Sequence, residues 1–289
     1  MTPFDLDPQA ILAALGVTDA AAIAPVSGGR DTAIFRVERG AATYALRVFR
    51  PEQRQVAQME MQAMRAAAAA GVPVPRIHAE GIHVDRAALL LDWCSGEMVA
   101  SLLLRDPDRA YPLGVACGVT LAQIHTIEAP VAFHEDGWLR WSGINPDDPF
   151  HARIVAHARP KRLLHLDFHP LNIMTDGEQV TAVLDWANAR AGDSRADIAR
   201  AIAILRLDTV DLPPAARPIL CAYERGLRTG YLQAAGPQAD MAIFHAWAGR
   251  AMLHDIAPRL ASNPTQAARF RRWIHLWESV ERKQSDLET

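Results

Sequence analysis

Lysine is almost absent from this chain of 289 residues, since Lys161 and Lys283 are the only lysines among its 30 basic residues. Any function that needs a basic side chain in the first 160 residues must therefore use arginine. The chain also has no basic excess, because its formal net charge is −3. Nucleic-acid-binding proteins gather positive charge on one face, so this balance argues against a nucleic-acid partner.

Cysteine and long apolar runs are scarce as well. The three cysteines, Cys94, Cys117 and Cys221, lie far apart and form no CxxC pair, which is typical of a reduced, cytoplasmic protein. No apolar run approaches the roughly 18 residues of a membrane span. The acidic N-terminal segment lacks the positive charge of a signal peptide. These absences predict a cytoplasmic globular protein without a membrane partner.

The apolar pattern predicts two parts of different character. Residues 27–50 contain two apolar runs joined at Arg39-Gly40, which is typical of a β-hairpin. Residues 52–70 contain neither Gly nor Pro and stop at Gly71, as expected of a long helix. After about residue 97 the pattern is mostly helical, with strands expected at 161–168 and 179–186.

This order predicts an α+β fold with two lobes. Residues 1–92 would form a β-rich N-lobe with one long helix. Residues 93–97 would form a hinge, and residues 98–289 a larger, mostly helical C-lobe. The length of the chain suits either one large domain or two modest ones.

Two charged residues fall among apolar neighbours in the first lobe. Glu60 lies on or beside the apolar stripe of the predicted helix, where an unpaired carboxylate is costly. Arg47 lies between apolar residues of the preceding strand. An Arg47–Glu60 ion pair would account for both charges. Alternatively, Glu60 lies at the edge of the stripe in water and Arg47 extends to the surface.

The stretch HLDFHPLNIM, residues 165–174, has two interpretations. As a strand it would place His165, Asp167 and His169 on one face, which is a reasonable ligand set for a metal-dependent hydrolase. As a strand end followed by a loop it would hold Asp167 for proton or hydroxyl handling, with Asn172 close by. Pro170 interrupts a strand and favours the loop.

Further polar residues follow at the end of the next predicted strand. Asp185 comes directly after the apolar run VTAVL, so we expect it at the edge of a strand. Carboxylate and amide oxygens such as those of Asn172 and Asp185 are ligands that Mg²⁺ prefers. Asp193 and Asp197 precede an apolar run and indicate the acidic beginning of a helix.

These segments resemble those of the aminoglycoside phosphotransferase and choline-kinase-like family. HLDFHPLNIM resembles the catalytic loop of that family, which reads His-Gly-Asp-x-His-x-x-Asn, and VLDWANARAGDSRADIA resembles the metal-binding segment after it. QMEMQAMRAAAAAGVPVPRIHAEG resembles the N-lobe helix with its Gly-x-Pro-x-Pro exit, and LAQIH resembles a helix of the larger lobe. The resemblance runs in the right order from about residue 23 to 205.

The resemblance implies a protein-kinase-like fold with ATP bound between the lobes. Adenine would lie against the hinge near Asp92, Trp93 and Cys94. The phosphates would lie under a glycine turn, where backbone N–H groups come close to an anion. That turn consists of Ser27, Gly28, Gly29 and Arg30.

The resemblance also implies an ATP- and Mg²⁺-dependent phosphotransferase that acts on a hydroxyl group of a small molecule. Asp167 would be the catalytic aspartate, and Asn172 and Asp185 would be the Mg²⁺ ligands. Arg47 would take the place of the lysine that anchors the phosphates, with Glu60 as its partner.

Two positions depart from the family pattern. Arg47 stands where the family usually has lysine, and a guanidinium is a wide fork rather than a point charge. This departure keeps open a second alternative, a nucleotide-binding protein without transfer activity. Leu166 stands where the family often has glycine, a change that alters the backbone and removes no ligand.

The acceptor would be selected by the helical C-terminal region. Phe270, Trp273 and Trp277 are spaced as a helical stripe, which is more typical of core than of a ligand site. A polycationic aminoglycoside would need clustered carboxylates, but Asp255 and Glu278 are interspersed with arginines. A sugar, amino alcohol or related metabolite fits this region at least as well as an antibiotic.

Overall fold

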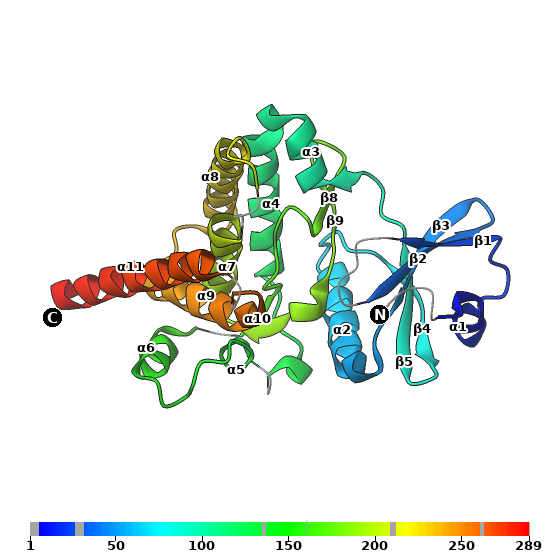
Figure 1. Cartoon of the computed structure of the whole chain (residues 1–289), viewed down its shortest axis with the longest axis horizontal. Helices are drawn as coiled ribbons and strands as arrows, with labels where there is room; N and C mark the ends of the chain where they lie inside the picture. Colours follow the sequence, from blue (N-terminus) through cyan, green and yellow to red (C-terminus); the bar gives the residue numbers. More distant parts are fainter. Residues whose placement is uncertain are drawn as a thin grey trace.

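The computed structural model describes residues 6–26, 32–134, 137–159, 161–208, 212–260 and 263–288. A β-sheet forms the N-terminal region and helices form most of the rest (Figure 1). This arrangement confirms the predicted α+β fold class. The sheet is antiparallel with the order β1-β2-β3-β5-β4. Its strands are β1 (Ala22–Val26), β2 (Ala33–Arg39), β3 (Ala42–Val48), β4 (Ile77–His83) and β5 (Arg86–Asp92).

One helix covers each face of this sheet (Figure 1). Alternate residues of β2, such as Phe35 and Val37, pack with Leu90 of β5 and with α1 (Pro8–Ala14). The opposite face of β5, with Leu89, packs in the cluster that contains α2 (Arg54–Ala69). Because side chains alternate between the two faces of a strand, β5 is apolar throughout its middle. The sheet is thereby fixed against the rest of the molecule through α2.

The helical part is built around a long pair of helices, α4 and α8. Gly114 and Gly118 on α4 face Gly226 and Gly230 on α8, and a Cβ at any of them would lie 2.0–2.2 Å from a backbone oxygen of the other helix. The two backbones are therefore in direct contact. The helices of this part are α3 (Val99–Arg105), α4 (Ala110–Ile124), α5 (Trp138–Trp141), α6 (Pro149–His157), α7 (Ser194–Leu207), α8 (Ala216–Ala235), α9 (Met241–Asp255), α10 (Ala257–Leu260) and α11 (Pro264–Glu288).

The aromatic stripe of α11 belongs to the core, as predicted. Phe270 is fully buried, and Trp273 and Trp277 pack against the cluster that contains α9. The indole nitrogen of Trp273 donates to the carbonyl oxygen of His245 at 2.8 Å. In the part of the chain that the structure describes, no helix is long and apolar enough to span a membrane.

Short strands support the loop that carries the polar residues. They are β6 (Glu97–Met98), β7 (Arg162–Leu164), β8 (Ile173–Thr175), β9 (Val180–Val183) and β10 (Arg190–Gly192). The prediction of strands over 161–168 and 179–186 is therefore wrong in extent. β7 ends because the N–H groups of His165 and Leu166 donate to a side chain, the carboxylate of Asp197, and leave no strand partner. β9 ends because Asp185 adopts a left-handed conformation, with φ of 58°.

Candidate active site

The loop after β7 holds Asp167 and Asn172 in contact. The amide nitrogen of Asn172 donates to the Asp167 carboxylate at 3.0 Å and to the Asp167 carbonyl oxygen at 3.0 Å. The backbone N–H of Leu184, at the end of β9, donates to the carbonyl oxygen of Asn172 at 2.8 Å. The loop is therefore tied to the strand that precedes Asp185.

The environment of Asp167 keeps its carboxyl group ionised. Burial opposes ionisation, yet the hydrogen bond and charge of His169, followed by the charge of Arg200, lower the pKa of Asp167 to about 2. The nearest nitrogen of His169 lies 3.5 Å from the Asp167 carboxylate. At neutral pH this carboxylate is an anion that can accept a hydrogen bond from a hydroxyl group.

His165 is a supporting residue of the loop. It is fully buried, its Nε2 lies 3.0 Å from the carbonyl oxygen of Leu184, and its Nδ1 accepts from the N–H of Asp167 at 3.2 Å. Burial lowers the pKa of His165, which favours the neutral ring that this pattern needs. Both ring nitrogens are engaged, so His165 cannot bind a metal ion together with Asp167 and His169. The interpretation as a strand of metal ligands is therefore wrong.

Asp197 organises the backbone of the loop. Its carboxylate accepts from the N–H of His165 at 2.6 Å and from the N–H of Leu166 at 2.9 Å. His125, which caps the C-terminus of α4, contacts the same carboxylate at 3.1 Å and the hydroxyl of Tyr231 on α8 at 2.7 Å. Burial opposes ionisation, but the hydrogen bond from His125 and the positive groups around it lower the pKa of Asp197.

The sequence placed Asp197 at a helix beginning but gave no sign of this anchoring. Asp193 is the residue that caps α7, through the N–H of Arg195. Leu166, whose N–H donates to Asp197, adopts a left-handed conformation with φ of 60°. Glycine adopts this conformation most easily, which explains why it is common at this position in the family that the sequence resembles. A leucine there costs about 1 kcal/mol in backbone strain, and burial of its side chain offsets that cost.

Arg47 joins the sheet to the helical part. Its Nη1 lies 2.5 Å from the carboxylate of Glu60 on α2, so the structure contains the ion pair expected from the sequence. Its Nη2 lies 3.0 Å from the carboxylate of Asp185, and its Nε donates to the hydroxyl of Thr32 at 3.2 Å. Each nitrogen of the guanidinium thus has its own partner. A lysine, with a single nitrogen, could not span the same three groups.

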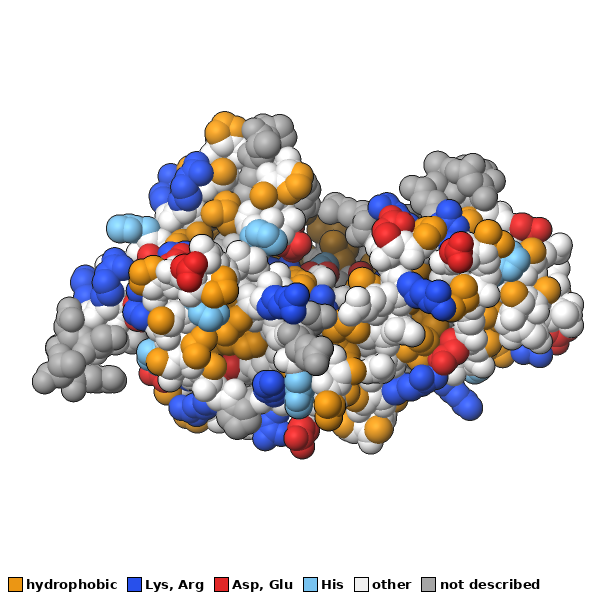
Figure 2. Space-filling view, turned by 90° about the horizontal axis from the view of Figure 1, so that it is seen from below, with side chains coloured by type: hydrophobic (Ala, Val, Ile, Leu, Met, Phe, Trp, Pro, Cys, Tyr) orange, Lys and Arg blue, Asp and Glu red, His pale blue; other side chains and the backbone are white. Residues whose placement is uncertain are grey.

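The two carboxylates that Arg47 holds differ in their surroundings. Glu60 is 1% exposed, and burial raises its pKa to about 7, against the opposing charge of Arg47. The side chain of Asp185 is 44% exposed. Asp185 is therefore the partner that a ligand can reach. Figure 2 shows the surface hollowed between the sheet part and the helical part, with acidic side chains and a histidine on the floor of the hollow.

The predicted adenine-binding segment follows β5. The side chain of Asp92 accepts from the N–H of Arg76 at 3.2 Å and lies 2.5 Å from Nε2 of His78. It is therefore turned toward β4, which the sequence did not indicate. Trp93 is partly exposed, with the guanidinium of Arg36 lying 5.5 Å from its ring centre.

The other residues predicted to contact the nucleotide are Cys94 and the glycine turn. Burial raises the pKa of the Cys94 thiol to about 11, so this thiol is protonated at neutral pH. The glycine turn of Ser27, Gly28, Gly29 and Arg30 lies outside the described residues.

Asn172 and Asp185 are the candidate ligands for a cation. The amide nitrogen of Asn172 is turned to Asp167, which leaves the amide oxygen as the end that can bind a cation. Among the residues that the structure describes, no three His, Cys, Asp or Glu side chains gather as a metal cluster. A site with two protein oxygens suits Mg²⁺, which keeps waters and binds substrate phosphates.

The sequence matches a family of phosphate-transferring enzymes and, over a short segment, one kinase. Residues 22–242 match the model of the phosphotransferase enzyme family. Hygromycin-B 4-O-kinase from Escherichia coli is 35% identical over 74 residues, which are 26% of this chain and 18% of that protein. The sequence alignment thus spans less than a fifth of that relative.

Solved structures of similar proteins share the fold. The aminoglycoside phosphotransferase APH(4)-Ia has a TM-score of 0.64 at 16% identity, over 92% of this chain and 95% of its own. A protein from Haemophilus somnus 129PT designated a fructosamine-3-kinase has a TM-score of 0.62 at 12% identity, over 93% of this chain and 95% of its own. Spectinomycin phosphotransferase APH(9)-Ia, solved with ADP and spectinomycin, has a TM-score of 0.57 at 13% identity, over 92% of this chain and 91% of its own.

Proposed function

This chain belongs to the phosphotransferase enzyme family, and we propose that it transfers the γ-phosphate of ATP to a hydroxyl group of a small molecule in a Mg²⁺-dependent reaction. The observation that carries the proposal is the position of Arg47. Its guanidinium reaches Glu60 on one side and Asp185 on the other, 3.0 Å away. It thereby stands where the sheet part meets the segment that follows the Asp167 loop.

The contacts support the following residue roles. Arg47, oriented by Glu60 and Thr32, binds the phosphates of ATP, and its Nη2 leaves Asp185 when they enter. Asn172 and Asp185 would hold Mg²⁺ through their oxygens, and the ion would supply charge neutralisation for the phosphates of ATP. The hinge at residues 93–97 receives the adenine between an N-lobe of residues 1–92 and a C-lobe of residues 98–289.

Asp167 acts on the acceptor. Its carboxylate accepts a hydrogen bond from the acceptor hydroxyl and orients that oxygen toward the γ-phosphorus. The new oxygen–phosphorus bond forms as the bond to the β–γ bridging oxygen breaks, and ADP leaves. The hydroxyl proton passes to Asp167 and then to solvent. A carboxylate with a pKa of about 2 is a weak base, which suits a loose transition state in which positioning contributes more than early proton transfer.

Replacing Asp167 by asparagine tests the proposal. Asp167→Asn keeps the size of the side chain and removes its charge. We expect ATP-dependent phosphorylation to fall by at least about a hundredfold, while the dissociation constant of ADP, measured by calorimetry, changes little. Asp176→Asn is the matched control, because Asp176 only accepts backbone N–H bonds within its own turn. Wild-type turnover in Asp167→Asn would refute the role.

The acceptor of this chain is not fixed by its similarity to other proteins. The similar proteins are named for hygromycin B, spectinomycin and fructosamine, and these compounds differ from one another. Family membership favours transfer over a nucleotide-binding protein without activity. A screen of ATP consumption across sugars, amino alcohols, homoserine, macrolides and aminoglycosides tests for transfer activity. If no compound of the panel increased ATP consumption, the nucleotide-binding protein without transfer activity would be favoured.

A further inference from the structure

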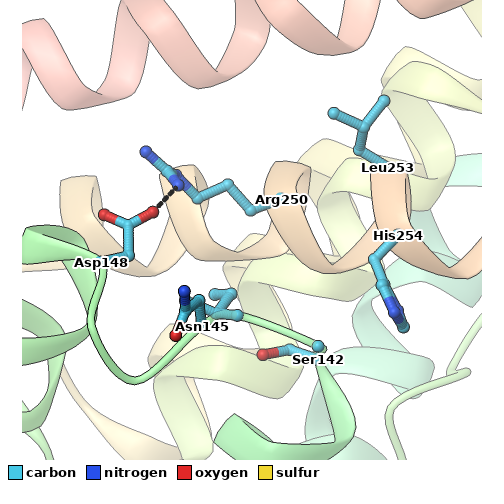
Figure 3. Close-up of a pocket in the computed structure, with 8 residues that line it drawn as sticks. Ser142, Asn145, Asp148, Arg250, Leu253 and His254 are labelled. Atoms are coloured by element: carbon cyan, nitrogen blue, oxygen red, sulfur yellow. Dashed lines mark hydrogen bonds and ion pairs between the residues drawn. The ribbon is translucent and has the colours of Figure 1, made fainter.

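A pocket of about 280 Å³ lies in the helical part, between residues 142–148 and one face of α9. Figure 3 shows Ser142, Asn145 and Asp148 on one wall and Arg250, Leu253 and His254 on the other. The two walls are about 100 residues apart in the chain, so no local sequence motif marks the pocket. Its volume lies near the lower end of small-molecule sites, which suits a ligand of about one sugar ring.

A buried guanidinium connects this pocket to the loop that carries Asp167. Arg200 is 2% exposed and its Nε donates to the carbonyl oxygen of Leu166. Its Nη2 lies 2.7 Å from the carboxylate of Asp255, which follows His254 of the pocket. Its guanidinium also lies 4.6 Å from the ring centre of Trp141, which precedes Ser142. Both walls of the pocket are thus fixed to the backbone beside Asp167.

Arg250 sets the charge of the pocket. Its Nη1 lies 2.8 Å from the carboxylate of Asp148, and its Nη2 lies 2.6 Å from that of Glu278. The Nε of Arg250 donates to the same oxygen of Glu278. A guanidinium has five N–H groups, so Arg250 retains donors beyond these three contacts. Asp148 also accepts from the N–H of Phe150, and this hydrogen bond together with Arg250 lowers its pKa.

The carboxylates around the pocket are therefore matched with arginines: Asp148 and Glu278 with Arg250, and Asp255 with Arg200. A polycationic ligand would need carboxylates without such partners, because each arginine would repel it. An anionic ligand would need a guanidinium that is not already held between two carboxylates. An uncharged ligand with many hydroxyl groups meets neither cost, since each hydroxyl both donates and accepts.

We propose that this pocket binds the phosphoryl acceptor and that the acceptor is an uncharged sugar or polyol of about one ring. The proposal rests on the function proposed above and adds the substrate class. The free N–H groups of Arg250 and the amide nitrogen of Asn145 donate to hydroxyl oxygens of the ligand. The carboxylate of Asp148 accepts from its hydroxyl groups.

Arg250→Gln tests the charge argument. The change keeps hydrogen-bonding capacity but leaves Asp148 and Glu278 without their arginine, so the pocket becomes acidic. We expect the KM of a neutral sugar to rise about tenfold, with a smaller change in kcat. The ratio of kcat/KM for an amino sugar over the neutral sugar should rise about tenfold as well. Arg228→Gln, which removes an arginine–glutamate contact on α8, is the matched control and should alter neither value.

Asn145→Ala is the second variant, because it changes only a loop side chain and avoids the ion pairs of α9. It should raise the KM of the neutral sugar severalfold and leave the KM of ATP unchanged. An unchanged sugar KM in both variants would overturn the proposed pocket. The same holds if wild type phosphorylates only polycationic aminoglycosides, an outcome that leaves the phosphotransferase function itself intact.

A direct binding measurement distinguishes failure of the proposed pocket from failure of the proposed phosphotransferase function. Saturation-transfer NMR with glucose, fructose and ribitol, using wild type with ADP and Mg²⁺, reports on the pocket without turnover. Binding that is lost in Arg250→Gln supports the pocket even if no ATP is consumed, in which case the proposed function fails. ATP-dependent transfer without sugar binding overturns the substrate class and retains the function.

Discussion

Glu60 should make the stability of this protein depend on pH. The free carboxyl group of an unfolded chain has a pKa near 4.5, whereas burial raises the pKa of Glu60 to about 7 in the folded protein. Between these two values the folded state keeps a proton that the unfolded state has lost. Stability therefore falls as pH rises from about 4.5 to about 7, and the contribution is constant outside this window. The difference between the two pKa values corresponds to about 3 kcal/mol.

Glu60→Gln removes this contribution. We expect the free energy of unfolding of Glu60→Gln, relative to wild type, to increase by about 3 kcal/mol between pH 4.5 and pH 7. Urea denaturation followed by tryptophan fluorescence measures it, and comparing the two proteins cancels the other titrating groups. Glu80→Gln is the control, since its pair with Arg65 is exposed and such pairs contribute little.

The opposite slope would refute the reasoning. If wild type gains stability over Glu60→Gln as pH rises through the window, the charge of Arg47 outweighs burial, and Glu60 is a carboxylate with a lowered pKa. A flat difference would show that the two effects cancel. In either case Glu60 would be ionised at neutral pH, and the ion pair with Arg47 would be permanent there.

Three other changes test the site and its support. Asp185→Asn preserves the left-handed backbone, which asparagine tolerates. It should raise the Mg²⁺ concentration for half-maximal rate at least about tenfold, whereas the control Asp176→Asn should not. If the two variants need the same Mg²⁺ concentration, Asp185 is not a ligand of the proposed metal site. Asp197→Ala leaves the N–H groups of His165 and Leu166 without their acceptor. The kcat should therefore fall by about a hundredfold or more, and the free energy of unfolding should fall by about 3 kcal/mol. A steady-state kcat near that of wild type would contradict the anchoring role of Asp197. Gly230→Ala places a Cβ about 2.0 Å from the carbonyl oxygen of Val115. The free energy of unfolding should fall by about 2 kcal/mol, which urea denaturation measures as a lower midpoint. An unchanged midpoint would mean that α4 and α8 can move apart without loss of stability.

Local patterns were sufficient to predict the order of elements and one long-range contact. Alternating apolar residues indicated the hairpin that contains Arg47, and the apolar stripe on α2 placed Glu60 on or beside the buried face of that helix. The cost of burying an unpaired charge made an Arg47–Glu60 pair one of the two arrangements expected, and the structure contains that pair. The roles assigned to Asp167, Asn172 and Asp185 stay predictions until variants are measured.

Contacts between distant segments could not be inferred from one sequence. The carboxylate of Asp197 ends β7 early, but nothing in the sequence near His165 and Leu166 shows that their N–H groups have a side-chain acceptor 32 and 31 residues away. Arg200 is an ordinary helix residue in the sequence, and only tertiary packing brings it and His125 to the loop. The two walls of the pocket between residues 142–148 and α9 share no motif for the same reason.

The close approach of α4 and α8 constrains how this enzyme can diverge. Four glycines at that seam exclude any larger residue, because a single methyl group meets the main chain of the opposite helix. The walls around Asn145 and Leu253, by contrast, are made of side chains that can be exchanged without moving a helix axis. Natural drift and laboratory selection toward new substrates should therefore accumulate at residues 142–148 and 250–254, while the seam stays invariant.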